Sequence, residues 1–285
     1  MEKINHTVRL FLIAIVMTTG FTSCNKNDLA DNTESLAAQN LNIAEIEDDN
    51  TQIMADQAES EGEVNLRLSQ PADNSEVDLI SGCAIVTRDT LSNPRMITID
   101  FGSGCTNRFG VTRKGKIIIT YTGRYRATGT VVHIVSENYY VNENKVEIDR
   151  TVTNQGPNTN GNLVFTVESS RKVTFTDGST SSSTANKIRE WLEGADTPRD
   201  FSDDVYKVTG TGTHISKRGI QYDATTLTPL IRKVSCHQFV RGQVRIVRQG
   251  DRDRFGTIDF GNGECDDVAT VTLDNGRTYT INLRH

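Results

Sequence analysis

The sequence lacks several features that are typical of enzymes and of membrane-spanning proteins. After Phe21 it has no apolar run of the length, about 20 residues, that a membrane-spanning helix needs. It contains no Gly-x-Ser-x-Gly motif, which presents the nucleophile of many serine hydrolases. It has no Cys-x-x-Cys pair and its histidines are scattered, so we expect no metal site of the zinc type. The sequence therefore shows no recognisable nucleophile for covalent catalysis.

The first residues resemble a lipoprotein signal sequence. Two basic residues precede an apolar run from residue 10 to 21, and Thr22, Ser23 and Cys24 follow it. Small residues before a cysteine resemble the lipobox that lipoprotein signal peptidase cleaves. We therefore expect residues 1–23 to be a signal peptide and Cys24 to carry the lipid. The alternative is an ordinary cleaved signal that leaves Cys24 as a free thiol.

The four remaining cysteines predict two disulfides, because an even number is typical of exported proteins. A short pattern, Thr-Ile-Asp-Phe-Gly-x-Gly, occurs twice, and each copy lies between two of these cysteines. Each copy reads as part of a hairpin, which returns the chain toward its first cysteine. We therefore expect Cys83 to pair with Cys105 and Cys236 to pair with Cys265.

Residues 24–63 are expected to form an acidic, disordered tether. From residue 25 to 63 the chain has one basic residue, eleven acidic residues, a net charge of −10 and no aromatic residue. Such a segment cannot bury enough apolar surface to order itself independently. A few aliphatic side chains still allow one or two short helical turns within it. The remaining residues, 64–285, are slightly basic, so the acidic overall charge belongs to the tether.

Residues 64–285 predict an antiparallel all-β domain. Apolar and polar residues alternate in segments such as 146–153 and 279–283, which is typical of strands with one buried face. Asp274-Asn275-Gly276 and Asp177-Gly178 are hairpin signals. We expect about fourteen strands in a large meander with little helix. The sequence leaves open whether the meander folds as a sandwich, an open barrel or a curved sheet.

Three segments of this domain are less regular. Residues 184–194 fit both a helical stripe and a strand, and we favour the strand. Residues 154–162 contain two glycines and a proline and are expected to form a loop. Residues 194–204 are expected to form a long loop, or the seam between two lobes.

Two aspartates occupy equivalent positions in the repeated pattern. Asp100 and Asp259 would be a tempting acid and base pair. Each lies immediately before a Gly-x-Gly turn, where a short carboxylate accepts hydrogen bonds from the amides of the turn. We therefore favour a structural role in the turn for both residues.

Oxygen-bearing side chains also gather in one loop near the C-terminus. Calcium uses such ligands, although the spacing matches no known calcium loop, and a solvated acidic turn is the favoured interpretation. No other cofactor is expected. The residues are Asp259, Asn262, Glu264, Asp266 and Asp267.

Basic residues gather around one predicted hairpin. With Trp191 they are a candidate surface that could bind an anionic glycan or lipid head group. The alternative is structural: basic residues that alternate along a strand normally form its solvated face, and a single tryptophan is normally buried. Nucleic acid is not an expected partner, because the protein is exported. The basic residues are Arg113, Lys114, Lys116, Arg124 and Arg126.

Several stretches of the chain resemble known lipoproteins. They are the signal that ends at Cys24, residues 97–105, 114–125 and 138–142, and the terminal hairpin at 259–283. Together they resemble a group of β-rich lipoproteins of Bacteroidota that are carried as hypothetical proteins. The resemblance implies an outer-membrane location and a β-rich fold, and it transfers no catalytic residues.

Two classes of function follow from these expectations. The first is a non-catalytic binding or accessory module that Cys24 anchors in the outer membrane, on its periplasmic face or at the cell surface. Its partner would be a glycan or another envelope protein. The alternative is a carbohydrate-active enzyme of the glycoside hydrolase type, with paired carboxylates on one sheet face.

Overall fold

The computed structural model describes residues 50–55, 58, 83–107, 110–197, 200–250 and 254–283. No helix within these ranges combines the length and the apolar character that crossing a membrane requires. A short 3-10 helix, η1, covers Val234–Cys236. The fourteen strands are β1 (Ile85–Asp89), β2 (Arg95–Asp100), β3 (Cys105–Thr106), β4 (Thr112–Tyr121), β5 (Val131–Val141), β6 (Asn144–Pro157), β7 (Leu163–Thr174), β8 (Thr180–Glu193), β9 (Val205–Ile215), β10 (Gln221–Lys233), β11 (Gln238–Arg248), β12 (Phe255–Asn262), β13 (Val268–Leu273) and β14 (Thr278–Asn282).

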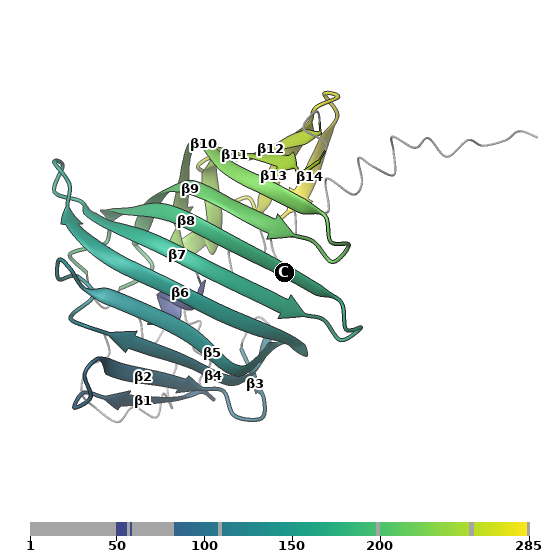
Figure 1. The fold of residues 1–285 in the computed structure, drawn as a ribbon. Coiled ribbons are helices and arrows are strands. Elements are labelled where there is room, and N and C mark those ends of the chain that lie inside the picture. Colours follow the sequence, from purple (N-terminus) through teal and green to yellow (C-terminus); the bar gives the residue numbers. More distant parts are fainter. Residues whose placement is uncertain are drawn as a thin grey trace, which may run out of the picture.

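All fourteen strands belong to one antiparallel sheet, which confirms the predicted all-β meander. Their order in space is the order in the chain, with one exception. The short strand β3 and strand β2 both pair with β4, at different parts of that strand. Figure 1 shows that the sheet bends, so that β10 to β14 turn behind the plane of β5 to β8. Of the three arrangements that the sequence left open, the structure is therefore the curved sheet.

The predicted hairpin turns are present. The Gly178 amide donates to the Phe175 carbonyl and the Gly276 amide donates to the Leu273 carbonyl, both at 2.9 Å. Gly178 has a φ of 80° and Gly276 a φ of 79°, a region that glycine enters without steric cost. These two turns set the register of the β7–β8 and β13–β14 hairpins.

Strand pairing shows which secondary structure the less regular segments of the sequence adopt. Residues 184–193 lie in β8, which confirms the strand interpretation. The loop expected at 154–162 is shorter, because β6 continues to Pro157 and pairs with β7 up to Leu163. Residues 194–204 connect β8 to β9, and these strands pair with each other from Ser182 to Glu193. The sheet therefore continues without interruption past the expected seam.

A helical segment covers part of one sheet face, which we call the inner face. Residues 50–55 and 58 are helical, and all of them are buried. This corrects the tether expectation for these residues: they are not solvated but packed against the domain. The rest of the expected tether, like the signal sequence and Cys24, lies outside the described residues.

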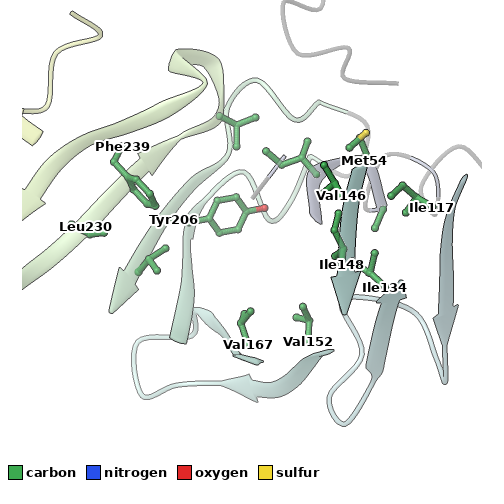
Figure 2. Close-up of a cluster of buried hydrophobic side chains, with 14 of the residues drawn as sticks. Met54, Ile117, Ile134, Val146, Ile148, Val152, Val167, Tyr206, Leu230 and Phe239 are labelled. Carbon is green, nitrogen blue, oxygen red and sulfur yellow. The ribbon is translucent and has the colours of Figure 1, made fainter. Parts of the chain in front are cut away.

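Apolar side chains of this helix explain why it docks. Ile53, Met54, Ala55 and Ala58 are at most 3% exposed and belong to the hydrophobic core. Figure 2 shows Met54 close to Val146 and Ile117, which belong to the same core cluster. Complete burial of a methionine side chain contributes about 1.5–3 kcal/mol. A few aliphatic residues in a segment that is otherwise acidic thus bring the helix onto the sheet.

Two disulfides connect the pairs expected from the repeated pattern. Cys83 and Cys105 have Cα atoms 5.6 Å apart, and the Cα atoms of Cys236 and Cys265 are 5.4 Å apart. The first disulfide joins the segment before β1 to β3, and the second joins η1 to the segment after β12. The first disulfide therefore lies near the β1 edge of the sheet, whereas the second lies two strands before the β14 edge.

Removing the second disulfide should destabilise the domain without changing its fold. It links residues 29 apart in the sequence, and loop closure of that length stabilises a protein by about 3–4 kcal/mol. We expect a Cys236→Ala/Cys265→Ala variant to lose about that free energy of unfolding. Urea unfolding followed by the fluorescence of Trp191 measures it. Reductant should then affect the wild-type protein more than the variant, and an unchanged midpoint would contradict the prediction.

Candidate functional site

The inner face can be traced residue by residue across the sheet. Directly paired residues of antiparallel strands lie on the same face. One row of such pairs runs from β1 to β13 and ends in the buried Leu273. It consists of Arg88, Ile97, Ile119, Ile134, Arg150, Ser169, Ala185, Gly212, Ala224, Ile246, Gly256 and Leu273.

Positive side chains are unusually frequent on this face. Arg113, Arg150 and Arg232 are 1% exposed, and Arg189 is 3% exposed. The pairing places further cationic residues on the same face, and the inner positions of the described strands carry no Asp or Glu. Apart from the exposed Arg95, which pairs with Tyr121, these residues, which we call the arginine face, are Arg88, Arg113, Arg150, Arg171, Lys187, Arg189, Arg232 and Arg248.

Buried guanidinium groups restrict what this face can hold. A charge taken out of water is costly unless it is hydrogen-bonded or paired. The planar guanidinium group matches carboxylates, phosphates and sulfates, because two of its N–H groups donate in parallel to two oxygens. The arginine face is therefore chemically suited to anionic groups or carbonyl oxygens.

Two of its arginines bind the buried helical residues. On β1, Arg88 donates from Nε and Nη2 to the Ala58 carbonyl oxygen, at 2.9 and 2.5 Å. On β10, Arg232 Nη2 donates to Asn50 Oδ1 at 3.2 Å. The helical segment is thus hydrogen-bonded to both β1 and β10.

Tyrosines accompany the arginines on this face. Arg113 Nε donates to Tyr139 Oη at 3.1 Å, and the Arg189 guanidinium lies over the Tyr206 ring at 3.5 Å from its centroid. Cation–π contacts of this kind contribute about 0.5–2 kcal/mol. The aromatic rings hold these two guanidinium groups in defined positions.

A buried carboxyl lies at one end of the arginine face. Asp204 is 3% exposed and accepts hydrogen bonds from Trp191 Nε1 at 3.1 Å and from Tyr206 Oη at 3.0 Å. Burial raises the pKa of its carboxyl to about 7, against the effect of these bonds and of the Arg189 charge. Asp204 therefore titrates near neutral pH inside an aromatic cluster.

A buried histidine lies at the other end of the face. His214, on β9, is 4% exposed, and burial together with the positive charge of Arg171 lowers its pKa to about 4. It is therefore neutral at physiological pH and does not add to the charge of the arginine face. Within the described residues neither ring nitrogen has a hydrogen-bond partner.

The inner face is hollowed only slightly. A cavity of about 40 Å³ lies where Gly210 and Gly212 remove side-chain volume beside Lys187 and Thr226. A second, of about 10 Å³, lies beneath Ala55 of the helix. These volumes hold a few water molecules, whereas pockets for small ligands typically enclose about 300–1,000 Å³. Neither cavity is lined by a carboxylate.

The basic patch expected from the sequence is not brought together on one surface. Arg113 lies on the inner face, Lys114 pairs with Glu143 at 2.7 Å, and Lys116 pairs with Asp100 at 3.4 Å. Alternation along β4 causes this separation, because successive side chains point to opposite faces. Arg124 is exposed, which leaves only Arg126 and Trp191 of the expected set in contact.

Arg126 and Trp191 form a packed pair rather than an open platform. The Arg126 guanidinium lies 4.6 Å from the Trp191 ring centroid, and Arg126 Nε donates to the Ala195 carbonyl at 3.1 Å. Trp191 itself is 2% exposed and packs against Tyr206, with ring centroids 5.3 Å apart. The buried placement that is usual for a single tryptophan is confirmed.

The two repeated aspartates have the expected turn role. The Gly102 amide donates to Asp100 Oδ1 at 2.8 Å, and the Gly261 amide donates to Asp259 Oδ1 at 2.9 Å. The other Asp259 oxygen accepts a hydrogen bond from Gln243 Nε2 at 2.8 Å. Both carboxylates therefore stabilise their own turns.

The acidic loop that was considered for calcium also binds its own donors. Asn262 and Asp266 accept from the Glu264 and Val268 amides, and Asp267 accepts from Gln238 Nε2 at 2.7 Å. Within the described residues no group of three or more metal-ligating side chains was found. The favoured interpretation of a solvated acidic turn stays a prediction, with calcium binding as its alternative.

The arginine face was missed when the sequence was interpreted. Its signal is visible in β6, where Val146, Ile148, Arg150 and Val152 occupy the buried positions of one alternating series. An arginine at one of the alternate positions of a strand that are otherwise apolar indicates a buried charge. Single residues of this kind on different strands form a cluster only after the strands pair.

The Asp204 carboxyl predicts a dependence of stability on pH. Its pKa rises from an ordinary value of 3.8 to about 7 in the folded state, so the folded protein retains a proton that the unfolded chain loses. The free energy of unfolding should therefore fall as pH rises from about 4 to 7, because the unfolded state binds fewer protons.

An Asp204→Asn variant tests this assignment, since the amide retains an oxygen acceptor but does not titrate. Its free energy of unfolding should depend less on pH between 4 and 7 than that of the wild-type protein. Urea unfolding at a series of pH values measures the difference, and Asp200→Asn serves as an exposed control. Equal slopes for all three proteins would refute the assignment.

Comparisons with known proteins do not place the chain in a family. It matches no protein-family model, and neither the curated proteins nor the solved structures contain a significant match. Any function must therefore be argued from the inner face itself and from the sequence that precedes the domain.

Proposed function

We propose that the protein is a non-catalytic binding module anchored in the outer membrane by a lipid on Cys24, on the periplasmic face or at the cell surface. The apolar signal before Cys24 supports the anchor, and the two disulfides fit an exported protein. The resemblance to β-rich lipoproteins of Bacteroidota supports the same location.

The observation that carries the binding role is the arginine face. A structural sheet face requires no buried arginines, and replacing buried charges by apolar residues is often neutral or stabilising. Arg113, Arg150, Arg189 and Arg232 are nonetheless buried on this face. We infer that the face binds anionic groups of a partner, either carboxylates and sulfates of a glycan or acidic side chains of an envelope protein.

The alternative, a glycoside hydrolase, receives support from one observation. Asp204 has a raised pKa and lies against Trp191 and Tyr206, as an acid in a sugar-binding site would. A hydrolase also needs a second carboxyl about 5–10 Å away in the same cleft. Neither cavity described above is lined by a carboxylate, so binding without catalysis is the stronger proposal.

The lipid anchor can be tested by metabolic labelling. The wild-type protein should incorporate labelled palmitate and sediment with outer membranes. A Cys24→Ala variant should do neither, whereas a Ser23→Ala variant, which keeps a small residue before the cysteine, should behave like the wild type. Equal labelling of the Cys24→Ala variant would exclude this residue as the anchor.

The binding role predicts charge-dependent association through the inner face. Dextran sulfate should bind at low ionic strength and uncharged dextran should not. Arg171→Gln/Arg248→Gln removes two charges from the less buried part of the arginine face and should weaken binding about tenfold, since hydrogen bonds to charged groups contribute about 1.5–3 kcal/mol.

Lys145→Gln/Lys172→Gln provides a control with the same loss of charge on exposed lysines, which pair with Glu147 at 3.3 and 4.0 Å. Its affinity for dextran sulfate should stay close to that of the wild type. Equal weakening by both double variants would indicate unspecific attraction to total charge and would contradict a site on the inner face.

A further inference from the structure

We propose that the helical residues 50–55 and 58 are a built-in occupant of the arginine face, which an external anionic partner must displace. This inference rests on the proposed binding function and names the competitor at the same site. It assigns a regulatory role to a segment whose composition alone predicts a flexible tether.

The helical residues are held as a ligand is held, by polar contacts at Asn50 and Ala58 and by apolar contacts between them. Arg232 binds Asn50 and Arg88 binds the Ala58 carbonyl. Between these anchors Met54 is fully buried. A helix on the surface of a domain normally keeps one polar face in water.

The polar residues of this helix do not follow that rule. Asn50, Thr51 and Gln52 are 7%, 2% and 0% exposed, although none of them is apolar. All described positions of the segment are therefore enclosed. This arrangement is expected for an occupant of a polar binding site and not for a helix that only covers a hydrophobic surface.

The sequence around the helix is acidic. Asp49 immediately precedes Asn50, and Glu59 immediately follows Ala58. Asp56 belongs to the same segment, in which the acids outnumber the bases by ten. The charge of the segment is thus complementary to that of the arginine face.

Competition follows from the shared site. When a segment of the same chain occupies a site, the apparent dissociation constant of an external ligand equals the intrinsic constant divided by the fraction of open molecules. Weakening the intramolecular contact should therefore open the helix more often and tighten external binding by the same factor. The lipid anchor precedes the segment, so release also lengthens the connection between the membrane and the domain.

The test uses two variants of the full-length processed protein that lose the same charge. Asp49→Asn/Asp56→Asn/Glu59→Gln neutralises acids at and within the helix. Asp28→Asn/Asp31→Asn/Glu34→Gln neutralises three acids more than ten residues before it. Hydrogen exchange of the amides in residues 51–58 measures opening of the helix, and titration with dextran sulfate measures competition.

We expect the first variant to exchange these amides about tenfold faster than the wild type and to bind dextran sulfate correspondingly more tightly. The second variant should match the wild type in hydrogen exchange. Equal exchange in all three proteins would overturn the inference, whatever the binding result. Faster exchange without dextran sulfate binding in any protein would instead overturn the proposed anionic ligand.

An Arg88→Gln variant tests the same contact from the sheet. It removes the guanidinium group that binds the Ala58 carbonyl, and it should also raise the exchange rate of residues 51–58 about tenfold. Unfolding followed by Trp191 fluorescence must remain cooperative in each variant, which separates release of the helix from loss of the fold. A cooperative Arg88→Gln variant with wild-type exchange would contradict the inference.

Discussion

The structure depends on covering one face of a single sheet. An isolated sheet cannot exclude water from a face by itself and needs a second layer. Here fourteen strands in one meander provide no second sheet, and curvature together with the helix at residues 50–58 replaces it. Met54, Ile117 and Val146 meet in this enclosed space (Figure 2). The segment that covers the sheet therefore belongs to the fold, although its sequence is that of a linker.

The same enclosure gives the arginine face its chemical character. Guanidinium groups that lie in water are screened and interact weakly with anions, whereas buried groups have stronger electrostatic contacts and a higher cost when left unsatisfied. Arg113 and Arg189 are positioned by tyrosines, and Arg232 by the helix. Burial, cation positioning and the docking of residues 50–58 are thus parts of one arrangement, in which a change to any of them alters the others.

Local chemistry explains what was predicted correctly. Alternation in β6 and β8, the glycine turns at Gly178 and Gly276, and the turn role of Asp100 and Asp259 all depend on residues within a few positions of each other. The disulfides were predictable because each pair closes over one repeated pattern. The basic residues around β4 do not form one surface, for a related reason. Arg113 and Lys114 are adjacent in sequence, and neighbouring side chains in a strand point to opposite faces.

By itself the sequence determined the strand-rich class, the turns and the cysteine pairs, since these follow from composition and short-range pattern. Only the tertiary structure decided that the sheet is curved, that arginines from separate strands share one face, and that residues 50–58 occupy it. The physical reason is register: Arg150, Arg189 and Arg232 lie far apart in the sequence and come to share one face only when their strands pair.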